Sequence, residues 1–188
     1  MKRFIAIIAL WFTVALAFFK RLGRHLRLAW AGGAVTFEAA LSAVVYRADG
    51  TIENLGVIGR KQVTTVFVNM LIDVLQKISG AVTNIQLFQY HDCGINTGDV
   101  AEGSADTALT TPFGGARVVG TYVEGSGANV YKTVATIPFT STQTIKEHGL
   151  FNASSGPSLM DRTVFTGIPV NNLDSIQFTY EFTANAGG

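Results

Sequence analysis

Ser175-Ile-Gln-Phe-Thr-Tyr-Glu-Phe-Thr183 is the most regular stretch of this sequence, because apolar and polar side chains alternate along it without interruption. Successive side chains of a β-strand point to opposite faces of its sheet. The alternation therefore predicts a strand with one buried face. The residues expected on that face are Ile176, Phe178, Tyr180 and Phe182.

Shorter strand patterns occur through much of the chain, separated by turns rich in Gly, Asn and Ser. Asp49-Gly50 stands between two of them, 41–47 and 51–58, and predicts a β-hairpin because glycine adopts a positive φ at little cost. Many short strands with such turns are typical of a β-sandwich or barrel. The other expected strands cover 84–90, 117–123, 130–139, 142–149 and 159–168.

One segment, residues 65–79, has helical rather than strand periodicity. Thr64 or Thr65 can cap its start, and Gly80 can end it. We expect it to pack on a sheet through one apolar face. That face consists of Phe67, Leu71, Val74, Leu75 and Ile78. The pattern as a whole predicts a mainly β fold: an antiparallel β-sandwich, jelly-roll-like or Greek-key, with one packed helix, in a domain covering residues 34–188.

Charge and hydropathy divide the chain into two parts. Residues 1–32 hold six basic side chains and no acidic one, whereas the rest of the chain holds eight basic and 13 acidic ones, for a net charge of +1. Residues 4–19 carry no charge, and a basic cluster follows at 20–27. We therefore predict an N-terminal arm, residues 1–31, that forms a long helix, apolar at first and then amphipathic.

An apolar helix must be buried by something, and three interpretations compete. We favour packing against other protein chains. The anchor residues would be Ile7, Leu10, Trp11, Val14, Phe18, Leu22, Leu26 and Trp30. A membrane span is less favoured, because residues 4–19 reach only about 24 Å as a helix and a span needs about 20 residues. A signal peptide is disfavoured because basic residues follow the apolar stretch, where cleavage needs small ones.

We expect no catalytic, metal or cofactor site. His91-Asp92-Cys93, with His148 as a distant partner, is a cluster of metal-type or nucleophilic side chains, but adjacent residues on an extended chain point in alternate directions. Three acidic residues in one loop lack the alternate-residue spacing of a calcium site: Asp99, Glu102 and Asp106. We expect residues 91–116 to form an extended surface loop, a type of segment that often contacts partners.

Several segments of the body carry a resemblance: Gly56-Val-Ile-Gly-Arg-Lys-Gln-Val-Thr-Thr65, Val68-Asn69, Tyr90-His-Asp-Cys-Gly94, Ala105-Asp-Thr-Ala-Leu-Thr110, Arg117-Val-Val-Gly-Thr121, Glu124-Gly125, Glu147-His-Gly-Leu-Phe-Asn152, Leu159-Met-Asp-Arg-Thr-Val-Phe165 and Asp174-Ser-Ile-Gln-Phe-Thr-Tyr180. Over residues 41–188, and most closely over 145–183, the chain resembles a recurrent, uncharacterised protein type of tailed bacteriophages and prophages. The resemblance implies a structural part of the virion, encoded near head and tail genes, rather than an enzyme. The chain departs from this type at residues 4–19, because the leader of the type is usually shorter.

The arm and the resemblance together predict a non-enzymatic, capsid-associated decoration, cement or minor head protein of a tailed-phage virion, docked through its arm. Its partners would be copies of itself, as a trimer or higher oligomer, and the major capsid or other virion proteins. No specific nucleic-acid partner is expected, since the run at 20–27 lacks an RNA-binding fingerprint. The alternatives are a tail, collar or fibre-attachment protein, a membrane-anchored β-domain with 4–19 in the bilayer, or a carbohydrate-binding module that exposes Tyr122 and Tyr131.

Overall fold

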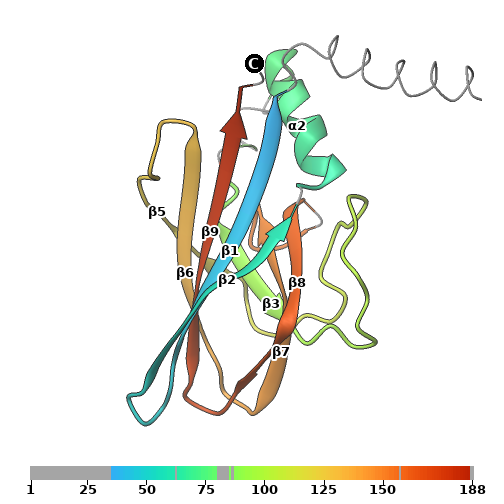
Figure 1. Ribbon diagram of the computed structural model, residues 1–188. Coiled ribbons are helices and arrows are strands. Elements are labelled where there is room, and N and C mark those ends of the chain that lie inside the picture. Colours follow the sequence, from blue (N-terminus) through green and yellow to red (C-terminus); the bar gives the residue numbers. More distant parts are fainter. Residues whose placement is uncertain (1–34, 62, 80–84, 86, 157, 187–188) are drawn as a thin grey trace, which may run out of the picture. The chain divides into compact units, whose positions relative to one another are not determined.

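The computed structural model of the chain describes residues 35–61, 63–79, 85, 87–156 and 158–186 (Figure 1). Residues Phe37–Ala184 form one compact unit. The predicted arm, residues 1–31, with all eight anchor residues lies outside the described residues, so the expected long N-terminal helix stays a prediction.

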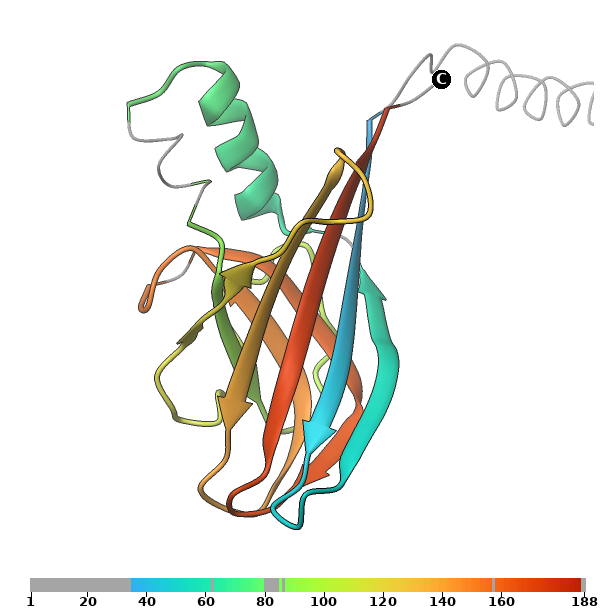
Figure 2. The same cartoon turned by 90° about the vertical axis from the view of Figure 1, so that its left-hand side faces the viewer.

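The described residues form two antiparallel β-sheets and one short α-helix, which confirms the predicted mainly β class (Figures 1 and 2). The first sheet has the strand order β2-β1-β9-β6-β5, and the second has the order β4-β3-β7-β8. The elements are β1 (Thr36–Tyr46), β2 (Ile52–Lys61), α2 (Thr65–Leu75), β3 (Tyr90–Gly94), β4 (Val118–Val119), β5 (Thr121–Tyr122), β6 (Val130–Pro138), β7 (Gln143–Phe151), β8 (Leu159–Val170) and β9 (Ser175–Asn185).

The apolar face of β9 lies at the centre of the core, as its alternation predicts. Ile176, Phe178 and Tyr180 are completely buried. The Phe178 ring lies 4.7 Å, centroid to centroid, from the ring of His148 on β7, and 6.3 Å from that of Phe165 on β8. Inward-facing residues of both sheets therefore belong to one core, in which each large side chain removed from water contributes about 1.5–3 kcal/mol.

The predicted hairpin at Asp49-Gly50 is confirmed. It joins β1 to β2, and Gly50 has a φ of 88°. The Asp49 carboxylate accepts a hydrogen bond of 2.8 Å from the backbone N–H of Thr51. The positive φ explains why glycine is favoured at this turn.

Helix α2 begins as predicted but ends early. The Thr64 hydroxyl accepts from the Phe67 N–H at 3.3 Å and so caps the helix. The last helical residue is Leu75 rather than residue 79, because Lys77 adopts a φ of 58°. The N–H of Lys77 then bonds to Val74 O at 3.1 Å, and the following N–H bonds to a carbonyl five residues earlier at 3.0 Å. These two bonds define a Schellman stop, which glycine usually occupies.

Only the first turns of α2 lie against the core. Phe67 is buried, with its ring 5.4 Å from the Phe182 ring. Leu75 and Ile78, which the periodicity places on the buried face, are 73% and 53% exposed. The prediction was wrong for these two residues, because Leu75 is the last residue of the helix and Ile78 lies beyond its end.

The prediction of a continuous surface loop over 91–116 was also wrong at its start. Residues 90–94 form β3, which lies between β4 and β7 in the second sheet, and His91 is completely buried. Polar residues hide this strand in the sequence, because His91 and Asp92 do not look like core residues. Residues 95–117 form the loop proper.

Candidate functional site

His91 and His148 lie on paired strands and share a buried hydrogen bond. The distance from His91 Nδ1 to His148 Nε2 is 2.9 Å, and His91 Nε2 lies 3.3 Å from the Thr133 hydroxyl. Burial lowers the pKa of His91 to about 3, and burial together with the His91 charge holds the pKa of His148 well below its ordinary value. Both rings are therefore neutral at physiological pH, and they join β3 and β7 to β6 of the other sheet.

Cys93 pairs across the strands with His148, so the structure does bring the suspected ligand types close together. The cysteine is 1% exposed, and burial, with the nearby carboxylates of Asp92 and Glu147, raises the pKa of its thiol. A reactive cysteine needs the opposite shift and access to solvent. Within the described ranges, no group of three or more His, Cys, Asp or Glu side chains is placed to hold a metal ion.

A second buried network fixes the loop 95–117 to the sheet. Arg162 on β8 donates from Nε to Glu147 Oε2 at 2.7 Å, with 2% and 0% of the two side chains exposed. Its other guanidinium nitrogens donate to a ring of loop acceptors. Those acceptors are Asn96 Oδ1, Val100 O, Ala101 O, Asp106 Oδ2 and Thr110 Oγ1. Burial alone would lower the pKa of Arg162, but its bonds to Glu147 and Asp106 raise it.

The three loop carboxylates weighed as a calcium site have separate roles. Asp99 contacts Lys146 Nζ at 2.7 Å, Glu102 Oε2 accepts from the Val164 N–H at 2.9 Å, and Asp106 contacts Arg162. Because each holds a different part of the loop, they do not converge on one point. The loop is thus a clamped element rather than an open ligand-binding segment.

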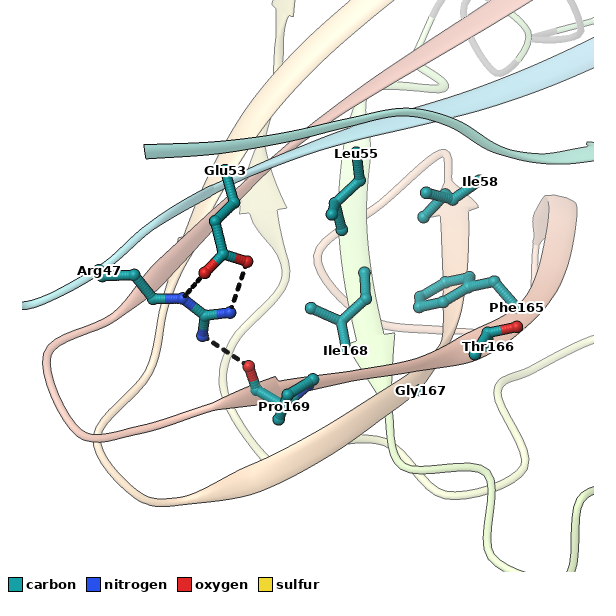
Figure 3. Close-up of a pocket in the computed structure, with 9 residues that line it drawn as sticks. All are labelled: Arg47, Glu53, Leu55, Ile58, Phe165, Thr166, Gly167, Ile168 and Pro169. Atoms are coloured by element: carbon teal, nitrogen blue, oxygen red, sulfur yellow. Dashed lines mark hydrogen bonds and ion pairs between the residues drawn. The ribbon is translucent and has the colours of Figure 1, made fainter. Parts of the chain in front are cut away.

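An apolar groove lies between β2 and β8, which are edge strands of the two sheets (Figure 3). Its volume is about 390 Å³, at the small end of ligand-sized cavities. Phe165 and Ile168 form its floor and are 8% and 5% exposed, whereas Leu55 on the rim is 39% exposed. Ile52 and Val57 of β2 are also exposed, but they pair with Tyr46 and Ser42 of β1 and so lie on the outer face of the sheet, away from the groove.

Bulges in both edge strands place these residues in the groove. In β2, Leu55 and Ile58 are extra residues relative to the β1 partners, and Gly56 beside them has a φ of 63°. In β8, the register leaves residues 165–167 opposite Lys146 alone. A bulge redirects a side chain and interrupts the ladder of an edge. Sequence reasoning missed the groove; the signal for it is glycine inside strands, at 56, 59 and 167.

A charged cluster closes one end of the groove. Arg47 donates to both carboxylate oxygens of Glu53, at 2.9 and 2.8 Å, and to Pro169 O at 2.7 Å (Figure 3). It also contacts Asp174 Oδ2 at 3.1 Å. The pKa of Glu53 is lowered mainly by its bonds to Arg47, and that of Asp174 mainly by backbone N–H donors. With the exposed Asp49 this end carries three carboxylates and one guanidinium.

Tyr122 and Tyr131, expected in one alternative to be exposed together, do lie together. Their ring centroids are 5.7 Å apart, and both line a shallow depression beside the 124–130 turn. Tyr122 is 47% exposed, whereas the Tyr131 hydroxyl donates to the carbonyl of Phe88. Of these two tyrosines, Tyr122 therefore presents the more exposed ring.

No α-helix among the described residues has both the length and the apolar character of a membrane span. The protein families, the curated proteins and the solved structures with which the chain was compared contain no match to it.

Proposed function

We propose that this chain is a structural assembly protein of a tailed-phage particle: a β-sandwich of jelly-roll-like or Greek-key type that docks on the capsid through its N-terminal arm as a decoration, cement or minor head protein. The observation that carries the proposal is the contrast between two sets of side chains. The histidines and the cysteine that could do chemistry are buried within the fold, whereas apolar side chains are exposed in the groove between the edge strands β2 and β8.

The buried networks support a structural role because each joins segments that are distant in sequence. His91 joins two sheets, and Arg162 joins β8 to the loop 95–117. All three guanidinium nitrogens of Arg162 donate hydrogen bonds, and such bonded polar groups in a core make the fold rigid and specific. A protein that must hold a partner against mechanical and thermal fluctuation benefits from that rigidity.

The exposed groove supports docking. Contiguous apolar surface with a polar rim marks an interaction site. The groove provides such a surface, with the apolar side chains of Leu55, Ile58 and Phe165 beside the ion pair of Arg47 and Glu53. The apolar, basic arm supplies a second one in the sequence, and the tailed-phage assignment rests on the resemblance described above.

Deleting residues 1–31 tests the proposal. The variant should fold, by circular dichroism, but its copies per purified particle, measured by quantitative mass spectrometry, should fall at least tenfold. A full-length control with Ile72→Ser and Leu75→Ser removes exposed apolar residues of α2 and should incorporate normally. Normal incorporation of the truncated chain refutes docking through the arm. If the full-length chain is found only at the tail vertex of the particle, it belongs to the tail, collar or fibre attachment instead.

Carbohydrate binding is a second candidate, favoured by the exposed ring of Tyr122 beside Tyr131. Aromatic surface next to turn amides and hydroxyls is a suitable platform for a sugar ring. A glycan array with the full chain and with Tyr122→Ala tests it. Binding that Tyr122→Ala abolishes supports this candidate, and an array without signal removes it.

A further inference from the structure

We infer that the groove between β2 and β8 binds the apolar leader, residues 4–19, of a second copy of this chain. The inference rests on the proposed assembly function and names the partner of the exposed edge. Figure 3 shows the groove open between the two strands, with Leu55 and Ile58 above Phe165 and Ile168.

The shape of the groove favours side chains as occupants over an added strand. Both of its strands are bulged where they face it, and Pro169 on β8 has no N–H to offer. A bulged or proline-containing edge pairs poorly with another strand. A partner must therefore insert side chains between the edges, as an apolar helix does when it docks in a groove.

The chemistry of the leader matches the groove. Residues 4–19 contain no charge and include five aromatic residues. An aromatic side chain removes about 150–250 Å² from water, and a groove of about 390 Å³ has the size for one or two of them. Phe165 and Ile168, at its floor, offer only apolar atoms there, so the inserted group is expected to be apolar.

Charge complementarity fixes the direction of docking. The groove ends at Asp49, Glu53 and Asp174, whose three carboxylates face one guanidinium, that of Arg47. Hydrogen bonds lower the pKa of each carboxyl group, so all three are ionised at neutral pH. The leader is followed at once by the four cations of residues 20–27. With the apolar part in the groove, these cations come to the acidic end.

Chain length argues for the leader of another copy rather than that of the same chain. The acidic end lies after Tyr46, at the end of β1, whereas the arm joins the start of β1 at Thr36. The nine steps from Arg27 to Thr36 span at most about 32 Å when fully extended, and the ten steps of β1 span about 33 Å at about 3.3 Å per residue. The same chain would therefore need this linker fully extended, whereas the spacing of Leu22, Leu26 and Trp30 predicts that its first residues are helical and much shorter. The arm of a second copy is free of this limit, and docking between copies links them into an assembly.

Disulfide trapping in the full chain tests the inference. One copy carries Thr13→Cys in the leader, and a second, of different tagged size, carries Thr166→Cys on the exposed rim of the groove. The two are co-expressed and oxidised mildly, while Cys93 stays unreactive because it is buried. The matched control is Thr136→Cys, an exposed threonine of β6 outside the groove.

The inference predicts a disulfide-linked heterodimer for the pair Thr13→Cys and Thr166→Cys. It should be at least tenfold more abundant than the heterodimer of the pair Thr13→Cys and Thr136→Cys. Equal trapping at both positions, or none, overturns it. So does trapping that occurs only within a chain carrying both Thr13→Cys and Thr166→Cys, because the leader would then belong to the same copy.

A second pair of variants separates this inference from the proposed function. Leu55→Lys in the groove should raise the dissociation constant for self-association at least tenfold by analytical ultracentrifugation, and Val119→Lys, on the exposed β4, should not. If Leu55→Lys leaves association unchanged while arm deletion abolishes incorporation, the inference fails and the function stands. If trapping succeeds but the truncated chain still joins particles, the function fails and the inference stands.

Discussion

Replacing Glu147 with leucine should destabilise the fold by about 3–5 kcal/mol, because it leaves the Arg162 guanidinium buried without its main counter-charge. The two side chains are 0% and 2% exposed and lie 2.7 Å apart, so water cannot replace the lost carboxylate. The N–H groups of Thr110 and Thr111 lose their acceptor as well, which adds to the loss. Asp106 keeps its 3.0 Å contact with Arg162 and limits the loss to this range.

The assay is urea denaturation followed by circular dichroism, with Lys146→Met as the matched control on the neighbouring residue. Lys146 forms an equally short ion pair, 2.7 Å to Asp99, but 36% and 76% of these side chains are exposed. Exposed pairs contribute about 0–1 kcal/mol. The control should therefore change the free energy of unfolding by less than about 1 kcal/mol.

The double variant Glu147→Leu/Arg162→Met separates a stranded charge from a lost contact. Removing both partners should recover part of the stability, since no uncompensated charge remains. Glu147→Leu should also make the loop 95–117 more sensitive to protease than the control does, because that loop depends on Arg162. If Glu147→Leu is no more destabilising than Lys146→Met, the description of this network as the clamp of the loop is refuted.

Three further predictions concern other parts of the fold. The buried His91 and His148 have folded pKa values below the unfolded value, so below pH 6.5 the unfolded chain binds protons that the folded chain does not. The free energy of unfolding should therefore fall by up to about 1.4 kcal/mol per pH unit for each histidine, measured by urea titration from pH 7 to 5. Gly120→Ala should cost about 1–3 kcal/mol in the same titration at pH 7, since a Cβ there would lie 2.5 Å from the Thr133 hydroxyl. Thr64→Ala should cost about 1–2 kcal/mol and lower helix content, because it removes the cap of α2; no loss of helix content would contradict this role.

Local patterns predicted several regular elements but not all: the strand expected over 84–90 begins only at Tyr90, and the one expected over 117–123 is divided into β4 and β5 in different sheets. The alternation at 175–183 corresponds to β9, the Asp49-Gly50 turn to its hairpin, and Thr64 to a cap. Each signal acts within a few residues, through side-chain direction, a positive φ or one hydrogen bond. The end of α2 was predicted four residues too late, because the residue with positive φ that stops the helix is Lys77 and not a glycine.

The networks and the groove could not be predicted, because their residues meet only in the fold. Glu147 and Arg162 are ordinary charged residues in sequence and become a buried pair only when β7 and β8 align. His91 was assigned to a loop because its polarity hides the strand that buries it. Leu55 and Phe165, 110 positions apart, share a groove through bulges whose register no local pattern specifies.

The same strand, β8, carries both the clamp and a groove wall, and this connects stability to docking. Arg162 is fixed by Glu147, and the Val164 N–H is held by Glu102 at 2.9 Å, immediately before the bulge at 165–167 begins. A bulge keeps its shape only when its flanks are held, so loosening the clamp should move Phe165 away from its place in the groove. Glu147→Leu is therefore expected to weaken both the fold and self-association, whereas Leu55→Lys should weaken self-association alone. Loss of association in Leu55→Lys at unchanged unfolding free energy would show that the groove surface itself, and not the rigidity behind it, makes the contact.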